Sequence, residues 1–265
     1  MTRMGRKLKV LLLVPLVVLL AVVLQAAAQR PSLDRGWDDD VRVLAGVELL
    51  ADGTVRLTDI RDWRYRGDSI VSRAYFDAGF DPADLVDVWM YEQILDRRGL
   101  IAHTFLVFEF DSSYGPTRWL GLSVETRRER GETYSLVGGV LRAFEVTHIW
   151  ATEQDLVTRR VQHLDYPLTR YRLLLSAEQR ARIFRRFAEE TRELAIEPRW
   201  YNTVTRNCTS SLIRYVNEGR PGALPWDHSW ILTGRVDDYL ARLGYLDRGS
   251  SVYITSEWLA SSPLR

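Results

Sequence analysis

The first 28 residues have a different pattern from the rest of the chain. A basic head, with four cations and no acid within residues 1–9, precedes an unbroken apolar run from Val10 to Leu24, and three alanines end at Ala28. This order is typical of a secretory signal peptide. Extended through the alanines, the run is also long enough for a membrane anchor of about 18 residues. Both interpretations keep the basic end in the cytoplasm and place the remainder outside the inner membrane.

Alternating apolar and polar positions predict a sheet in the middle of the chain. Residues 46–65 alternate around Asp52-Gly53, which is a strong signal for a hairpin turn. Four later segments are rich in β-branched or aromatic residues, and Gly, Ser and Asp separate them. They are Ala102–Phe110, Trp119–Thr126, Leu141–Trp150 and Tyr166–Leu175. Residues 84–98 have a mixed pattern that fits either a strand or a helix.

Helical periodicity follows the predicted strands. Ser176 and Gln179 form a capping-box pattern, apolar residues then recur on one helical face, and Pro198 ends the segment. A second helix is predicted over Cys208–Gly219 and a third over Arg235–Leu243. Strands followed by helices predict an α+β fold.

The pattern divides the chain into three parts. Residues 1–28 are predicted to be a signal peptide or N-terminal membrane anchor, and residues 29–45 a polar linker that contains a proline. Residues 46–265 are predicted to form one exported domain, with an antiparallel sheet and helices. With 46% hydrophobic and 27% charged residues, the chain has the composition of a folded protein.

The charge distribution argues against nucleic-acid partners. The formal net charge is +1, and removing the four cations of the first nine residues leaves −3 for the exported part. No basic patch remains that would neutralise a row of phosphates. Lys7 and Lys9 are the only lysines, so the exported part has none for Schiff-base or lysine-nucleophile chemistry.

Cys208 is the only cysteine of the chain and therefore forms no internal disulfide. In an oxidising compartment a lone thiol is buried, paired between chains, or used chemically. Thr205 and Asn207 are good N-cap residues, which predicts that Cys208 lies in the first turn of a helix. Unpaired N–H groups and the helix dipole favour a thiolate there, so we predict a reactive thiol. The alternative is a buried structural cysteine.

A thiolate nucleophile commonly pairs with a histidine that delivers a proton to the leaving group. Of the four histidines, His103 opens a predicted strand at a rigid edge, whereas His148 lies within a strand and is predicted to be structural. Glu125 lies on the next predicted strand, on the same face as Ser123, where it can orient the imidazole. Its alternative role is an exposed carboxylate paired with Arg127.

The chain lacks the motifs of several other enzyme classes. It contains no GxSxG nucleophile elbow, no Walker loop and no HExxH, and one cysteine with scattered histidines does not fit a structural zinc site. Glu153 and Asp155 fit a hard-cation site, but capping or solvating a turn is the simpler interpretation. We therefore expect no metal and no cofactor.

Several motifs in a fixed order carry a resemblance to a known family. They are Asp59–Tyr65, Ala102–Phe105, Ser123–Arg127 with Gly131-Glu132, Phe144–Val146, Thr152–Asp155 with Arg159, and Tyr201–Thr209. With these motifs the chain resembles, over roughly residues 57–246, the Lnb N-terminal periplasmic domain family. This bacterial family was long without a known function and has been linked to lipoprotein N-acylation.

The resemblance implies a circularly permuted papain-like fold of the NlpC/P60 type, in which the histidine precedes the cysteine in the chain. The site residues that it implies are the catalytic Cys208, His103 and Glu125 and the supporting Asn207, Ser123 and Tyr201. Glu125 would orient His103, and Asn207 would lie on the oxyanion side or cap the helix. The implied location is the cell envelope, either anchored to the inner membrane or free in the periplasm.

The implied reaction moves an acyl chain from a membrane phospholipid, through a thioester on Cys208, to an amine of a lipoprotein or another envelope acceptor. Two alternatives stay open. The first is a thiol hydrolase, acting as a phospholipase or as a peptidoglycan peptidase or amidase, and the second is a non-catalytic envelope scaffold. The apolar residues Trp226, Trp230, Ile231 and Leu232 either line a lipid-accepting groove or belong to the core.

Overall fold

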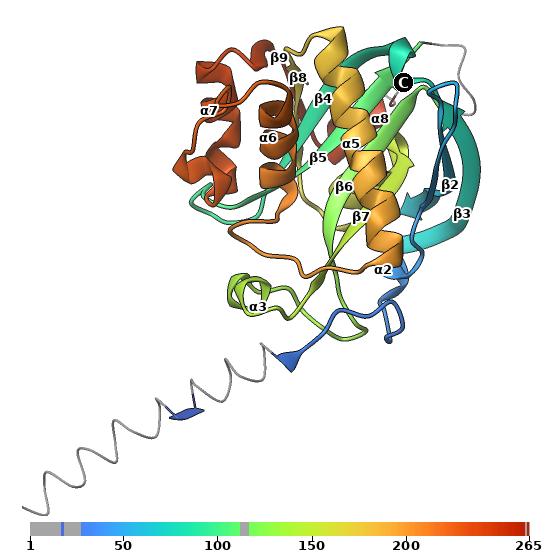
Figure 1. The fold of residues 1–265 in the computed structure, drawn as a ribbon, viewed down its shortest axis with the longest axis vertical. Helices are drawn as coiled ribbons and strands as arrows, with labels where there is room; N and C mark the ends of the chain where they lie inside the picture. The colour runs from blue at the N-terminus through green and yellow to red at the C-terminus, as the bar shows by residue number, and fades with distance from the viewer. Residues whose placement is uncertain (1–16, 19–27, 112–116, 263, 265) are drawn as a thin grey trace, which may run out of the picture.

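A computed structural model gives the fold for residues 17–18, 28–111, 117–262 and 264. Within these residues nine strands form one sheet, and helices pack on its faces (Figure 1). The architecture is mixed α+β, as predicted. Most of the apolar run Val10–Leu24 lies outside the described residues. In the part that the structure describes, no helix combines the length and the apolar character needed to cross a membrane.

The sheet joins segments that are far apart in the chain. Its strands are β1 (Gly46–Leu49), β2 (Val55–Arg66), β3 (Ser69–Phe80), β4 (Leu85–Ile94), β5 (Ala102–Phe110), β6 (Trp119–Arg127), β7 (Glu145–Thr152), β8 (Leu168–Leu173) and β9 (Leu246–Ile254). Across the sheet their order is β1-β2-β7-β6-β5-β4-β8-β9, and β3 also pairs with β2. The pairing is antiparallel, as predicted, except that β2 and β7 run parallel.

Helices and turns complete the fold. They are α2 (Asp39–Arg42), α3 (Leu136–Val140), α4 (Glu153–Thr158), the π-helical turn η2 (Arg159–His163), α5 (Ala177–Ile196), α6 (Cys208–Gly219), α7 (Val236–Arg242) and α8 (Ser256–Ser261). The capping box predicted at Ser176 is present, because Ser176 Oγ accepts from Gln179 N while the Gln179 side chain accepts from Ser176 N. These bonds satisfy backbone donors that the first turn of a helix leaves free.

Alternation along the central strands produces two apolar layers. In β5, Leu106 and Phe108 belong to the layer that also contains residues of α5, α6 and α7. Phe105 and Val107 belong to the opposite layer, with residues of α4 and α8. Successive side chains of a strand point to opposite faces, so one short strand is held by both layers. The end of β5 is therefore a rigid place from which to present a side chain.

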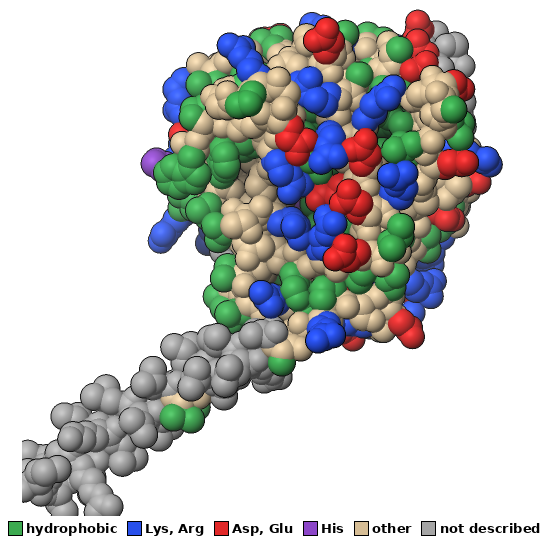
Figure 2. Space-filling model, in the orientation of Figure 1, with side chains coloured by type: hydrophobic (Ala, Val, Ile, Leu, Met, Phe, Trp, Pro, Cys, Tyr) green, Lys and Arg blue, Asp and Glu red, His purple; other side chains and the backbone are tan. Residues whose placement is uncertain are grey.

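The outer face of α5 is charged. Arg186 donates to Glu218 at 2.7 Å and also contacts Glu189, and basic and acidic side chains alternate over this face (Figure 2). Exposed pairs of this kind contribute little to stability. What holds α5 in place is its inner side, where Ile183 and Phe184 are fully buried.

The structure differs from the sequence predictions at several elements. Residues 84–98, which fitted either a strand or a helix, contain the strand β4. The predicted strand from residue 141 begins only at Glu145, in β7. The predicted turn at Glu153–Asp155 is the start of helix α4, capped by the Thr152 side chain. The strands β3 and β9 were not predicted; most residues of β3 are exposed, so apolar alternation does not mark it.

The segment predicted as a linker packs against the domain. Trp37 and Val41 are 4% and 3% exposed, and Trp37 pairs with Glu129 in an isolated β-bridge. Ser32 N donates to Glu145 Oε1 at 2.7 Å. The ordered domain therefore includes residues before the predicted boundary at residue 46, and the chain approaches it at the edge where β6 ends and β7 begins.

We predict that Phe184→Ala lowers the free energy of unfolding by about 3–5 kcal/mol, because it removes a large core side chain. The ring is fully buried and contacts Phe80, Phe108, Phe110 and Trp150. Chemical denaturation measures the change. The control is Ile196→Ala on the same helix, where a side chain that is 78% exposed should cost less than about 0.5 kcal/mol. Equal losses in the two variants would contradict the description of the core.

Candidate active site

The thiol of Cys208 and the imidazole of His103 meet at the end of β5. Cys208 is the first residue of α6, and His103 is the second residue of β5. The backbone N–H of Thr104 donates to Cys208 Sγ at 3.5 Å, and the thiol and the imidazole are close enough that each shifts the pKa of the other. The strand β5 and the start of the helix α6 thus bring together two side chains that are 105 positions apart in the sequence.

Asn207 fixes the start of α6. Its side-chain oxygen accepts from Thr209 N at 2.9 Å and from Ser210 N at 2.7 Å, and its Nδ2 donates to the carbonyl oxygens of Thr203 and Trp230. All its side-chain hydrogen-bonding capacity is therefore used. Of the two roles implied for Asn207, the structure shows the cap and leaves no donor for an oxyanion. Among the described residues the Cys208 N–H has no acceptor, so it is the free donor of this helix end.

The other side of the imidazole faces β6. His103 Nε2 lies 2.8 Å from Ser123 Oγ and 3.3 Å from Glu125 Oε1. Ser123 Oγ also donates to Glu125 Oε1 at 2.7 Å. These contacts occupy Nε2 and leave Nδ1 for the thiol. Glu125 is not an exposed partner of Arg127, because Arg127 donates instead to the backbone carbonyl oxygens of Val41 and Arg42 in α2.

The charges of the pair support each other. Burial disfavours the thiolate of Cys208, but the hydrogen bond and the positive charge of His103 outweigh it and lower the pKa of the thiol to about 7. Burial likewise disfavours a charged His103, but the charge of Glu125 and the contact with Cys208 raise the pKa of the imidazole to about 9. Between these two values the pair is a thiolate and an imidazolium.

Arg160 completes the site, and the sequence analysis did not find it. Arg160 is 2% exposed, and its guanidinium lies over the ring of Phe105. Its Nη2 donates to Glu125 Oε1 at 2.7 Å and to Ser123 Oγ at 3.0 Å. The same nitrogen lies 2.9 Å from His103 Nε2. Burial raises the pKa of Glu125, but His103 and Arg160 outweigh it and hold that pKa well below its ordinary value. Glu125 is therefore a fixed negative charge.

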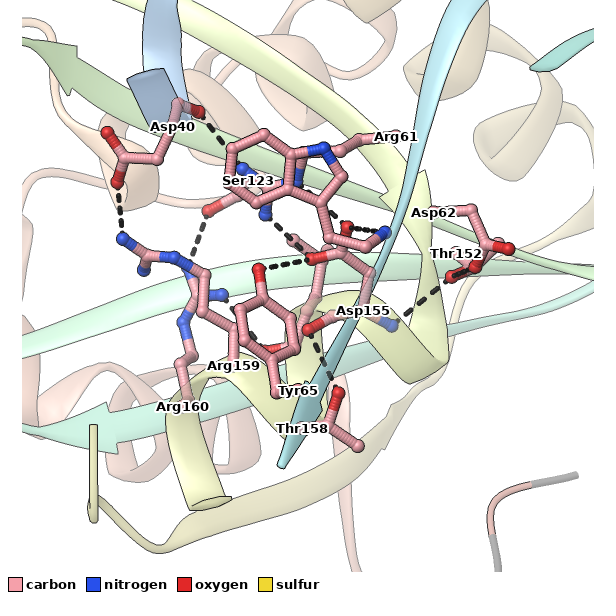
Figure 3. A network of polar contacts seen from close by, with 12 residues as sticks. Asp40, Arg61, Asp62, Tyr65, Ser123, Thr152, Asp155, Thr158, Arg159 and Arg160 are labelled. Atoms are coloured by element: carbon pink, nitrogen blue, oxygen red, sulfur yellow. Dashed lines mark hydrogen bonds and ion pairs between the residues drawn. The ribbon is translucent and has the colours of Figure 1, made fainter. Parts of the chain in front are cut away.

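A second buried network holds the turn that carries Arg160. Asp155, in α4, accepts from Arg61 Nε at 2.9 Å and Nη2 at 2.8 Å, from Trp63 N at 2.8 Å and from the Tyr65 hydroxyl at 3.3 Å (Figure 3). The carboxylate predicted as a possible cation ligand is thus bound by protein donors. No cluster of metal-binding side chains occurs among the residues that the structure describes.

A cavity of about 390 Å³ opens beside the thiol. Its walls include Cys208, His103, Glu125 and the buried side chains of Gln93 and Tyr201. Gln93 is the strand partner of His103, so both side chains lie on the same face of the sheet. The Glu125, His103 and Gln93 side chains form a row across β6, β5 and β4.

The remaining wall of the cavity combines apolar and basic side chains. The apolar ones include Leu95, Ile101, Leu164, Tyr166 and Ile231. The basic ones, besides Arg160, are Arg128 and Arg159.

The other predicted residues lie in different places. His148 is buried, with Nδ1 2.8 Å from Thr191 Oγ1, and burial lowers the pKa of its ring, as fits a structural role. Of the apolar residues considered for a groove, Ile231 lines the cavity, whereas Trp226 is 67% exposed. Leu232 is partly exposed next to Ile231, and Trp230 packs against the main core.

Comparison with known proteins gives one match. The family described as the Lnb N-terminal periplasmic domain matches residues 72–238, which is more than half of the chain. The matched range includes every residue of the site described above, whereas Arg61, Trp63 and Tyr65, which hold α4, lie before it. No curated protein and no solved structure matches the chain.

We predict that alkylation of Cys208 by iodoacetamide rises with pH through a midpoint of about 7 in the intact protein. In His103→Ala the imidazolium is lost while burial of the thiol remains, so the midpoint should move up to or above the ordinary thiol pKa of 9.0. At pH 7 the rate should then fall roughly tenfold or more. Mass spectrometry of quenched samples measures it without ambiguity, because the chain has one cysteine.

The matched control is His228→Ala, which removes an exposed histidine outside the cavity. This variant should keep the midpoint of the intact protein. A midpoint near 9 in the intact protein, or an equal shift in both variants, would show that His103 does not activate the thiol.

Proposed function

The chain belongs to the Lnb N-terminal periplasmic domain family and is therefore a periplasmic protein of the cell envelope, and on that premise we propose that it is a cysteine acyltransferase. In this proposal Cys208 takes an acyl chain from a membrane phospholipid and passes it to an amine, such as the N-terminus of a lipoprotein. The observation that carries the proposal is the thiol of Cys208 beside the imidazole of His103 in the wall of one cavity, with Glu125 3.3 Å from the imidazole Nε2.

The first half of the reaction forms a thioester. The Cys208 thiolate attacks the carbonyl carbon of the ester, and the carbon–oxygen bond to glycerol breaks. His103, as an imidazolium, gives the Nδ1 proton to the departing glycerol oxygen, so that the lysophospholipid leaves with a neutral hydroxyl group. The neutral imidazole that remains is still oriented by Ser123 and Glu125.

The second half of the reaction transfers the acyl group. An amine attacks the thioester carbon, His103 accepts the proton that the amine loses, and the carbon–sulfur bond breaks to give an amide. The thiolate and the imidazolium are restored together. No cofactor is needed, because the bonds formed and broken involve only the acyl group, the thiol, the glycerol oxygen and the amine.

Two donors of the cavity wall are available to the negative charge that develops in each tetrahedral intermediate. The Cys208 N–H points out of the start of α6, where the helix dipole favours an anion. The Gln93 carboxamide is buried in the cavity wall on the opposite side of His103 from Glu125. We assign both donors to the oxyanion.

The apolar part of the cavity wall supports a lipid substrate. Leu95, Leu164 and Tyr166 line the cavity and are also 40%, 37% and 40% exposed, so their side chains reach the mouth. Apolar side chains at a cavity mouth favour contact with an acyl chain over contact with water.

The direct test is intact-mass spectrometry of the full chain mixed with phospholipid vesicles. We predict a mass increase of one acyl group, removable by hydroxylamine, which cleaves thioesters. The adduct should be absent in Cys208→Ser and at least roughly a hundredfold slower in His103→Ala, which loses the general acid. Addition of an N-terminal cysteine lipopeptide should then discharge the adduct and yield the amide.

The outcomes separate the competing functions. Free fatty acid without amide, in the presence of the lipopeptide, would mean that water resolves the thioester and that the protein is a hydrolase. Neither adduct nor fatty acid would favour the scaffold. The exposed variant His228→Ala should behave like the unaltered chain in every arm.

We also predict that Gln93→Ala slows thioester formation about 100-fold, as expected for loss of one oxyanion donor. The pH midpoint of alkylation by iodoacetamide should stay unchanged, because that reaction forms no oxyanion. Thioester formation in Gln93→Glu should be at least as slow, since the new carboxylate places a negative charge beside the oxyanion. A parallel loss of alkylation in Gln93→Ala would show instead that the residue only supports the position of His103.

A further inference from the structure

Two arginines of the cavity wall share one carboxylate. Arg159 donates to Asp40 Oδ2, and Arg128 Nη2 lies 3.6 Å from the same oxygen (Figure 3 shows Asp40 and Arg159). The side chains of Arg128 and Arg159 are 26% and 18% exposed, and both line the cavity that contains Cys208. Asp40 itself belongs to α2 and is not part of the cavity wall.

The charges of this wall do not balance. Arg160 and His103 are opposed by Glu125 and by the thiolate of Cys208. Asp40 opposes one of the two other arginines, which leaves one positive charge in excess. Of the two arginines, Arg128 is bound less tightly by the protein. Among the described residues its ion pair with Asp40 is long, and its buried Nε has no hydrogen-bond partner. A buried unpaired donor is costly, so an anion that accepts from this nitrogen would stabilise the cluster.

We propose that Arg128 and Arg159 form an anion subsite that binds the phosphodiester of the acyl donor. The assignment rests on the proposed function and adds to it the part of the donor that is recognised. In a glycerophospholipid the phosphate is only a few bonds from the ester that Cys208 attacks, so one cavity can hold both groups. Guanidinium groups bind phosphate oxygens by paired, charge-assisted hydrogen bonds, which suits two neighbouring arginines.

The apolar and basic walls then divide the substrate between them. The acyl chain lies against the apolar side chains of the mouth, and the phosphate lies against Arg128 and Arg159. The scissile ester joins these two parts and is held at the thiol. Binding energy from the phosphate thus positions a bond that does not itself touch the arginines.

The first experiment compares two donors with the same acyl chains, phosphatidylglycerol and the neutral diacylglycerol, in mixed micelles with the full chain. The rate of thioester formation on Cys208 should be higher with phosphatidylglycerol. Arg128→Gln and Arg159→Gln should each reduce this preference on the order of tenfold, the effect of one charge-assisted hydrogen bond, while the rate with diacylglycerol changes little. Arg128→Lys should restore part of the preference.

The second experiment does not depend on acyl transfer. Iodoacetate and iodoacetamide alkylate the same thiol, but only iodoacetate is an anion. The ratio of their rates at Cys208 should fall on the order of tenfold in Arg128→Gln and Arg159→Gln, for the same electrostatic reason. The control for both experiments is Arg118→Gln, an arginine paired with Glu109 at the other end of β5 and β6, which should change neither measure.

The results separate this proposal from the one it rests on. An unchanged alkylation ratio in both arginine variants would overturn the anion subsite. A reduced ratio without any preference for phosphatidylglycerol would overturn the phosphodiester as its ligand. A reduced ratio in a protein that forms no thioester with either lipid would sustain the subsite and overturn the acyltransferase.

Discussion

The site depends on one partly buried ion pair, between Glu125 and Arg160. Burial alone would favour a neutral Glu125, but the positive charges of His103 and Arg160 keep its pKa well below the ordinary value. The fixed negative charge raises the pKa of His103, and the resulting imidazolium lowers that of Cys208. Arg160 thus acts on the thiol through two intermediate groups, and its own place in the fold decides whether the thiol ionises near neutral pH.

The position of Arg160 is fixed by contacts that do not involve the thiol. Arg160 lies in the π-helical turn η2, which continues α4, and such turns often occur at functional sites. Asp155 holds α4 against β2 by accepting hydrogen bonds from Arg61, Trp63 and Tyr65. Removing one partner of a buried pair leaves an uncompensated charge, so this network has little tolerance for change. The segment around Arg61 therefore supports the active site, although it contacts none of the reacting atoms.

The sequence predicted those parts of the site that local rules determine. Cys208 lies at a helix start because Asn207 is a good cap, and Glu125 and His103 are neighbours because adjacent strands share a face. Arg160 was not predicted, because in the sequence Arg159 and Arg160 look like two solvent-exposed charges. Only tertiary packing buries Arg160. Gln93 was missed for a similar reason. Its strand fitted two patterns, so its register beside His103 was not available.

On the proposed reaction, the fate of the thioester depends on what covers the cavity mouth. Water and amine compete for the same carbon, and His103 can take a proton from either. Exposed apolar residues of the wall lie at the opening, namely Leu95, Leu164 and Tyr166. An acyl chain or a membrane surface against them would exclude water, whereas an amine carried by a lipid anchor would already be on the membrane side. The positive charge of the arginines also disfavours an ammonium ion and so favours the neutral, nucleophilic amine. On this proposal, the choice between transfer and hydrolysis would depend on the surface chemistry at the mouth and not on the catalytic pair.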